Sequence, residues 1–133
     1  AQVIKILKGL SQERDLTMMF ISHDLALVNH LCNQIVVMYA GRVVETGSPD
    51  EVMRQTAHPY TKALIAAVPR GLRGRREPLP VLVGNVERSG EGCNFAPRCP
   101  KALPICREIV PREISLTGQH KVACHLLDEG KGP

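Results

Sequence analysis

The sequence predicts an α/β fold in its first half, followed by a small, loop-rich C-terminal extension. Three observations predict this fold. Apolar residues repeat at helical spacing over residues 2–10, residues 16–21 form a short continuous apolar run, and residues 34–45 contain two β-branched runs around an Ala-Gly pair. The apolar run is typical of a strand buried on both faces of a parallel sheet. The paired runs, at 34–40 and 43–45, are typical of a hairpin.

Helix signals surround these strands. We expect a polar connection at residues 11–15 and a helix from Leu25 to Cys32. The sequence Ser-Pro-Asp-Glu at residues 48–51 predicts another helix start, because Ser caps a helix, Pro suits its first position and acids favour its positive end. The sequence His-Pro-Tyr at residues 58–60 begins a last helix, which is expected to end before Pro69.

Composition bounds the class of protein. The chain has 133 residues, of which 44% are hydrophobic, and its formal net charge is +4. The arginines of residues 70–76 have no interleaved aromatics, so a nucleic-acid partner is not expected. No apolar run approaches the ~18 residues that a membrane-spanning helix needs. The chain opens inside a helical pattern without Met, so we expect the native start to lie upstream.

The composition changes after the last predicted helix. Residues 70–80 hold four Arg, two Gly and two Pro, which is typical of a linker. Residues 81–133 have many turn residues and little periodicity, so a domain there needs a covalent or metal staple. We therefore expect a first part at 1–69, a linker at 70–80 and an extension at 81–133.

Four segments carry a resemblance to a known family. "FISHDLALV" (20–28) resembles the switch segment, or H-loop, of ABC ATPases, and "IVVMYAGRVVETGSPDEV" (35–52) resembles the strand, hairpin and helix that follow it. "HPYTKALIAAVP" (58–69) resembles a signature of the oligopeptide/dipeptide/nickel importer subfamily. "CNFAPRCPKALPIC" (93–106) resembles the C-terminal extension of that subfamily. The resemblance implies a partial ABC-ATPase core at residues 1–69.

Other parts of the ATPase machinery do not occur in the sequence. It contains no G-x-x-x-x-G-K-[ST] phosphate loop, no LSGGQ-like signature and no apolar strand ending in Asp-Glu. The resemblance places these segments before the first predicted helix. We therefore expect the chain to be a C-terminal fragment of an ATP-binding subunit and to lack ATPase activity by itself.

His23 is the candidate catalytic and nucleotide-contacting residue. It follows the predicted strand at 16–21, and ligands of open α/β sheets gather at the carboxyl ends of strands. A neutral imidazole can donate one hydrogen bond and accept another. On the local pattern alone, a loop histidine beside a helix cap is the favoured interpretation. The resemblance implies instead that His23 senses the γ-phosphate of ATP. We expect Ser22 or Asp24 to cap the next helix.

The extension contains a candidate metal-ligating quartet, spaced C-x5-C-x6-C-x17-C. Thiolates bind zinc or iron–sulfur clusters, and a chain without a signal sequence favours such ligation over disulfides. The spacing leaves zinc, a cluster and unligated thiols open, whereas the resemblance implies a [4Fe-4S] cluster with zinc as the alternative. His120 and His125 are substitute ligands that a complete quartet does not need. The quartet consists of Cys93, Cys99, Cys106 and Cys124.

The resemblance also implies partners and a location. A parent ATPase of this kind uses ATP and Mg²⁺, pairs with a second ATP-binding subunit, drives transmembrane permease subunits and acts indirectly with a substrate-binding protein. It works at the cytoplasmic face of the bacterial inner membrane. Two other function classes fit parts of the sequence: a stand-alone metal-binding interaction module, and a nucleic-acid binder that uses the Arg cluster.

Overall fold

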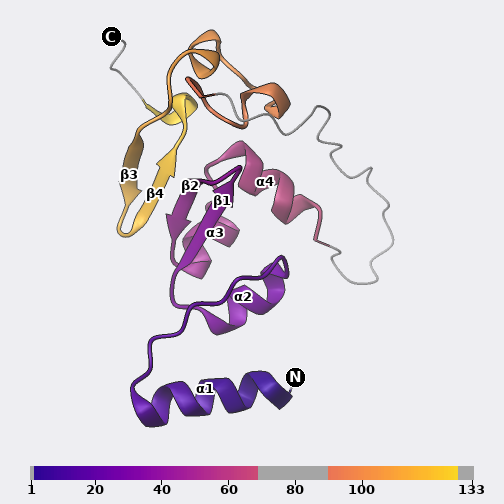
Figure 1. Cartoon of the computed structure of the whole chain (residues 1–133), viewed down its shortest axis with the longest axis vertical. Helices are drawn as coiled ribbons and strands as arrows, with labels where there is room; N and C mark the ends of the chain where they lie inside the picture. The colour runs from indigo at the N-terminus through magenta and orange to yellow at the C-terminus, as the bar shows by residue number, and fades with distance from the viewer. Residues whose placement is uncertain (1, 69–89, 129–133) are drawn as a thin grey trace.

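The computed structural model describes residues 2–68 and 90–128 (Figure 1). The linker predicted at 70–80 lies outside these residues. In the described part of the chain, no helix is long and apolar enough to cross a membrane.

The chain begins with helix α1 (Gln2–Arg14), which continues through the predicted polar connection at 11–15. The prediction of a break there was wrong because Gln, Glu and Arg are good helix formers and no Gly or Pro interrupts them. The helix ends at Asp15, whose φ of 49° is left-handed. Figure 1 shows α1 lying apart from the sheet.

The strand predicted at residues 16–21 does not form. Met19 is 88% exposed and Ile21 is 94% exposed, so this run is not buried either. A strand needs a neighbour to take up its backbone hydrogen bonds, and in residues 2–68 and 90–128 no strand pairs with this run. Its apolar composition alone therefore does not make it a strand.

Helix α2 (Leu25–Leu31) agrees with the prediction and begins where Asp24 accepts a 3.1 Å hydrogen bond from the Leu27 N–H. Val28 packs against the core of the sheet. Cys32 follows the last residue of α2 and is only partly buried.

A hairpin of β1 (Ile35–Tyr39) and β2 (Arg42–Gly47) forms as predicted. Its turn residues, Ala40 and Gly41, have φ values of 46° and 82°, the left-handed conformation that tight hairpin turns require. The extension then adds β3 (Glu113–Thr117) and β4 (His120–Ala123), giving the sheet order β1-β2-β4-β3.

Every strand pairing of this sheet is antiparallel, so the predicted parallel sheet is wrong for the described residues. The extension is also more regular than its turn-rich composition predicted. Strand β4 pairs with β2 through Glu45 opposite Val122 and Thr46 opposite Lys121. The extension therefore completes the sheet of the first part.

Two short helices cover one face of the hairpin. Helix α3 (Pro49–Arg54) starts with the predicted cap: Ser48 accepts from the Glu51 N–H at 3.3 Å, and Glu51 accepts from the Ser48 N–H at 2.7 Å. Helix α4 (Pro59–Ala66) also starts where predicted. Their packing against the hairpin buries the core.

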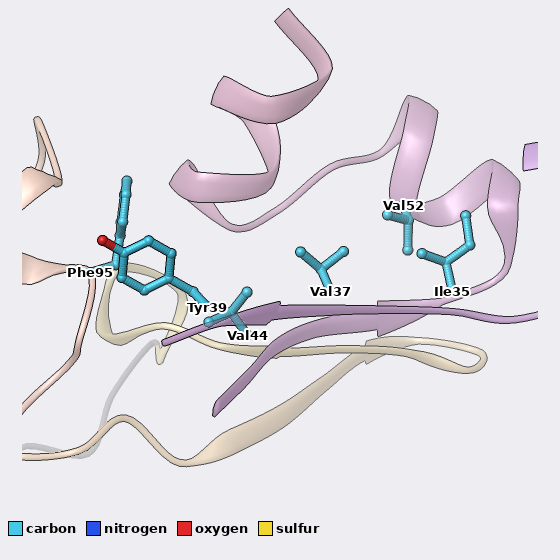
Figure 2. Close-up of a cluster of buried hydrophobic side chains, with 6 residues drawn as sticks. All are labelled: Ile35, Val37, Tyr39, Val44, Val52 and Phe95. Carbon is cyan, nitrogen blue, oxygen red and sulfur yellow. The ribbon is translucent and has the colours of Figure 1, made fainter. Parts of the chain in front are cut away.

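The core is a cluster of aliphatic and aromatic side chains between the hairpin and these helices (Figure 2). Figure 2 shows Val52 of α3 above the strand residues and Phe95 of the extension beside Tyr39. On the sheet's opposite face Val36 and Met38 are about half exposed, at 52% and 55%. The buried cluster consists of Ile35, Val37, Tyr39, Val44, Val52 and Phe95.

Candidate functional site

His23 lies in the exposed connection between α1 and α2, one residue before the helix cap Asp24. The residues on either side of it are exposed as well. Ser22 stabilises the connection by accepting a 3.0 Å hydrogen bond from the Asp24 N–H. The helix cap is therefore Asp24, and the imidazole of His23 faces solvent, where a ligand can reach it.

Each of the four extension cysteines lies at a 3-10 turn. Cys93 precedes the turn Ala96–Arg98, which Cys99 ends. Cys106 lies within the turn Pro104–Arg107, and Cys124 begins the turn His125–Leu127. Short turns of this kind present successive side chains at fixed angles without requiring a large core.

The first and second turns are joined through the backbone. The Cys93 N–H donates to the Cys106 carbonyl at 2.8 Å. Gly92 permits this approach, because a Cβ there would meet the Cys106 oxygen at 2.6 Å and the Arg107 backbone at 2.7 Å. The bare backbone of Gly92 thus holds the turns of Cys93 and Cys106 side by side.

The four thiols lie near enough to act on one another electrostatically. Burial, with smaller contributions from the charges of Cys99, Cys93 and Cys106, raises the pKa of Cys124 to about 11. Burial likewise raises the pKa of Cys99, with smaller upward effects from Cys106 and Cys93. An added positive charge at this place would relieve that mutual repulsion.

Backbone amides already oppose these shifts. Burial raises the pKa of Cys93, while N–H groups of Phe95 and Ala96 and the charge of Arg42 lower it. The Lys101 N–H acts in the same way on Cys99, and the Leu126 N–H on Cys124. Amides directed at sulfur stabilise a thiolate, which is the form that binds metals.

The thiols are free, and they do not form a single-ion site in the described residues. All five cysteines of the chain are unpaired. In residues 2–68 and 90–128, no three His, Cys, Asp or Glu side chains are close enough to hold one metal ion. The two substitute ligands are engaged elsewhere: His120 Nε2 lies 2.8 Å from Glu45, and His125 Nε2 lies 2.8 Å from the Ile109 carbonyl.

Polar contacts attach the cysteine turns to the hairpin. Asn94 donates to the Ala40 carbonyl at 3.1 Å, and Arg42 donates to the Gly92 carbonyl at 3.3 Å. Arg42 and Asn94 also line a cavity of about 80 Å³. It is far below the roughly 300 Å³ at which small-molecule pockets begin, so it is no nucleotide site. Its lining comprises Tyr39, Arg42, Val43, Val44, Cys93, Asn94, Val110, Pro111 and Ala123.

Aromatic rings form a second attachment. The Phe95 ring is 1% exposed and lies 5.1 Å from the Tyr39 ring and 5.4 Å from the Tyr60 ring. His58 lies 5.8 Å from Phe95 and caps α4 by accepting a 3.0 Å hydrogen bond from the Tyr60 N–H. The His-Pro-Tyr signature thus starts a helix and also holds the extension.

Burial lowers the pKa of His58 to about 4, and the nearby charge of Glu45 partly opposes that shift. The ring is therefore neutral at pH 7. A neutral ring is required here, because the nitrogen that caps α4 accepts a hydrogen bond.

Sequence reasoning missed the residue at the centre of this arrangement, Glu45. Its carboxylate is completely buried and accepts from the backbone N–H groups of Ala57 and His58 at 2.8 and 3.0 Å. The third partner is His120, which lies 75 positions later in the chain. The available signal was a carboxylate in the middle of a β-branched run.

Comparisons with known proteins agree with the resemblance to the peptide-importer subfamily. Residues 44–106 match the family model described as the oligopeptide/dipeptide transporter C-terminal region. A putative peptide import ATP-binding protein of Brucella abortus (strain 2308) is 42% identical over 129 residues, covering 95% of this chain and 38% of the relative. Two probable peptide ABC transporter ATP-binding proteins of Sinorhizobium fredii are 40% and 43% identical, covering 97% and 95% of this chain and 39% and 36% of the relatives.

The chain thus spans about two fifths of the length of the curated relatives it matches. The family match includes most of the second hairpin strand, the His-Pro-Tyr signature and three of the four extension cysteines. The chain is therefore similar to peptide-import ABC ATP-binding proteins over nearly its whole length, and its residues 44–106 match the oligopeptide/dipeptide transporter C-terminal region.

Proposed function

We propose that this chain is part of the ATP-hydrolysing subunit that powers import of di- and oligopeptides, or nickel, by an ABC transporter. The observation that carries the proposal is its identity to peptide-import ATP-binding proteins, 42% over 95% of the chain in one case and 40% over 97% in another. In the whole subunit, residues 1–69 belong to the nucleotide-binding domain, 70–80 to a linker and 81–133 to the extension.

The whole protein then works with partners. Two ATP-binding subunits, identical or homologous, enclose ATP and Mg²⁺ between them and drive transmembrane permease subunits at the cytoplasmic face of the bacterial inner membrane. A substrate-binding protein delivers the solute. The exposed apolar side chains of residues 3–21 and of the outer sheet face are consistent with burial against the remainder of such a subunit.

Within this function, His23 contacts the γ-phosphate and the attacking water. Its exposed imidazole, placed before a capped helix, supports the role because it can donate to a phosphate oxygen and accept from water. In the whole subunit, His23→Ala should lower ATP turnover about a hundredfold or more while ATP affinity changes little. His30→Ala, on the next helix, is the matched control. Wild-type turnover in His23→Ala would refute the role.

The chain of 133 residues should show no ATP turnover by itself, since it contains no phosphate loop, signature or Asp-Glu pair. The test is phosphate release by the purified chain, with the His23→Ala chain as background. Saturable hydrolysis that His23→Ala abolishes would contradict this expectation.

The four extension cysteines hold a metal centre in the same proposal, a [4Fe-4S] cluster in preference to zinc. Two observations support it: the thiols raise one another's pKa, and backbone amides are directed at three of them. The preference for a cluster comes from the resemblance, because the spacing of the cysteines alone does not exclude zinc. When bound, the metal centre would cross-link the three turns. By analogy with structural zinc, it would contribute on the order of 10 kcal/mol to the folding free energy.

The metal centre is tested by metal analysis of anaerobically purified protein. We expect iron and acid-labile sulfide with sulfur-to-iron absorbance, and we expect Cys106→Ser to lose them. Cys32→Ser is the control, because Cys32 stands on α2 outside the extension. Zinc in place of iron would select the alternative. If neither metal is present, or if Cys32→Ser and Cys106→Ser behave alike, the proposed centre fails.

A further inference from the structure

Glu45 joins three separate stretches of the chain through one carboxylate. Both the side chain of Glu45 and that of His120 are almost inaccessible, at 0% and 1–2% exposure. Oxygen Oε1 accepts from the Ala57 N–H and lies 2.8 Å from His120 Nε2, while Oε2 accepts from the His58 N–H. A carboxylate without access to water depends on these partners, because an unpaired buried charge is strongly destabilising.

The carboxylate and the groups that it binds come from three different elements of the chain. Glu45 is on β2, the Ala57–His58 turn begins α4 of the first part, and His120 begins β4 of the extension. The ladder between β2 and β4 has a register of two residue pairs. With so short a ladder, the buried pair of Glu45 and His120 carries a large share of the extension's attachment.

Two attachments of the extension, the His120–Glu45 pair and the Phe95 ring, lie close to its cysteines. His120 and Cys124 are at the two ends of one short stretch formed by β4 and the residue after it. Phe95, which packs on Tyr39 and Tyr60, is in the turn that Cys93 precedes. If the cysteine turns become less well ordered, the change therefore reaches both attachments through the hydrogen-bonded backbone.

We propose that Glu45 is a positioning residue that couples docking of the cysteine-bearing extension to the order of the turn before α4. When the extension is docked, His120 completes the hydrogen bonds of the carboxylate, which then holds the Ala57 and His58 amides. When His120 withdraws, water reaches the carboxylate and competes for it, so the turn and the start of α4 open locally. The coupling is reciprocal: whatever orders this turn also favours the docked extension.

The first experiment measures hydrogen exchange of the Ala57 and His58 amides in the full-length subunit. His120→Asn should speed their exchange about tenfold or more, because the shorter amide cannot reach Glu45. His120→Gln should restore slow exchange, since its amide nitrogen reaches the position of His Nε2. Lys121→Gln is the matched control: it changes the next residue of β4, whose ion pair with Glu113 is half exposed.

Two outcomes overturn the proposal in this experiment. Unchanged exchange at residues 57 and 58 in His120→Asn would mean that His120 does not support the carboxylate's hold on the turn. An equally large rise in the exchange rate of the β1 amides would mean that His120 stabilises the whole sheet. The coupling to the turn before α4 would then not be local.

The second experiment extends the coupling to the cysteine centre, and only this step rests on the proposed function. In Cys124→Ser, exchange at residues 57 and 58 should rise as in His120→Asn, with metal content measured on the same sample. Loss of metal without faster exchange would overturn the coupling and leave the metal centre standing. A wild-type protein without metal would refute the centre, and the His120→Asn result alone would then decide the role of Glu45.

Discussion

The N-terminal segment, residues 2–24, and the sheet region, residues 25–68 and 90–128, have similarly apolar sequences but fold very differently. In the N-terminal segment the large apolar side chains of α1 and the following connection are exposed, up to 94% at Ile21. In the sheet region, residues of the hairpin and of the distant extension close one core, with Val52 at 0% and Phe95 at 1% exposure. Apolar sequence becomes buried structure only where a complementary surface is present.

The largest expected contrast comes from removing one apolar side chain in each part. Phe95→Ala should lower the free energy of unfolding of the sheet region by about 3–5 kcal/mol, because it empties the ring cluster around Tyr39 and Tyr60. Ile21→Ala should change it by less than about 0.5 kcal/mol. Urea unfolding followed by circular dichroism measures both. Equal losses of unfolding free energy in the two variants would contradict the difference between the two regions.

A second test uses acid, because His58 is buried where the extension packs against the start of α4. Its pKa is about 4 in the folded chain and 6.5 as the ordinary value, so between these values the unfolded chain binds more protons. Stability from this group is complete above pH 6.5 and falls by up to about 3 kcal/mol as the pH drops to 4.

The control for the acid test is His58→Asn, which can still cap α4 but does not titrate. Its unfolding free energy should fall less steeply between pH 6.5 and 4 than that of the wild type. Parallel pH profiles for the two proteins would show that His58 is not the acid-sensitive group.

Two glycines only two residues apart sharpen the account of the extension. A Cβ at Gly92 would meet backbone atoms of Cys106 and Arg107 at 2.6–2.7 Å, whereas a Cβ at Gly90 meets nothing within 4 Å. Gly92→Ala should therefore cost about 1–3 kcal/mol and separate the turns of Cys93 and Cys106. Gly90→Ala should leave unfolding unchanged, and a similar cost at both positions would contradict the close approach.

The smallest effect compares two hydrogen-bonded serines. Ser48 caps α3 in the sheet region, and Ser11 donates a 2.8 Å hydrogen bond to the Leu16 carbonyl in the N-terminal segment. Ser48→Ala should cost about 1 kcal/mol of unfolding free energy. Ser11→Ala should cost less than that in the same urea titration, since its bond is exposed to water. A larger loss for Ser11→Ala would reverse the proposed order of the two regions.

The elements that could be predicted from sequence are those with local causes. The Ser48 cap of α3, the Ala40-Gly41 turn and the start of α4 each depend on residues within a few positions, and all three are confirmed. The strand at 16–21 was wrong because a strand needs a neighbour, which no local pattern reports.

The candidate sites also divide into those with a local cause and those that need a distant partner. The local pattern identified the four cysteines as a group, and the structure places their thiols within electrostatic reach of one another. Glu45 was missed because its burial depends on His120, and only the folded sheet brings β2 beside β4. The role of His23 stays a prediction, since it rests on the resemblance and on a ligand-accessible loop.

The central claim is that the N-terminal segment takes its structure from the remainder of an ATP-binding subunit, whereas the sheet region does not. Hydrogen exchange tests it most directly, by comparing this chain with the same residues inside a subunit of the relatives' full length. Amides of residues 17–22 should exchange as in an unfolded peptide in the chain and be protected in the full subunit, while β1 and β2 amides are protected in both. Equal exchange of residues 17–22 in the two proteins would contradict the claim.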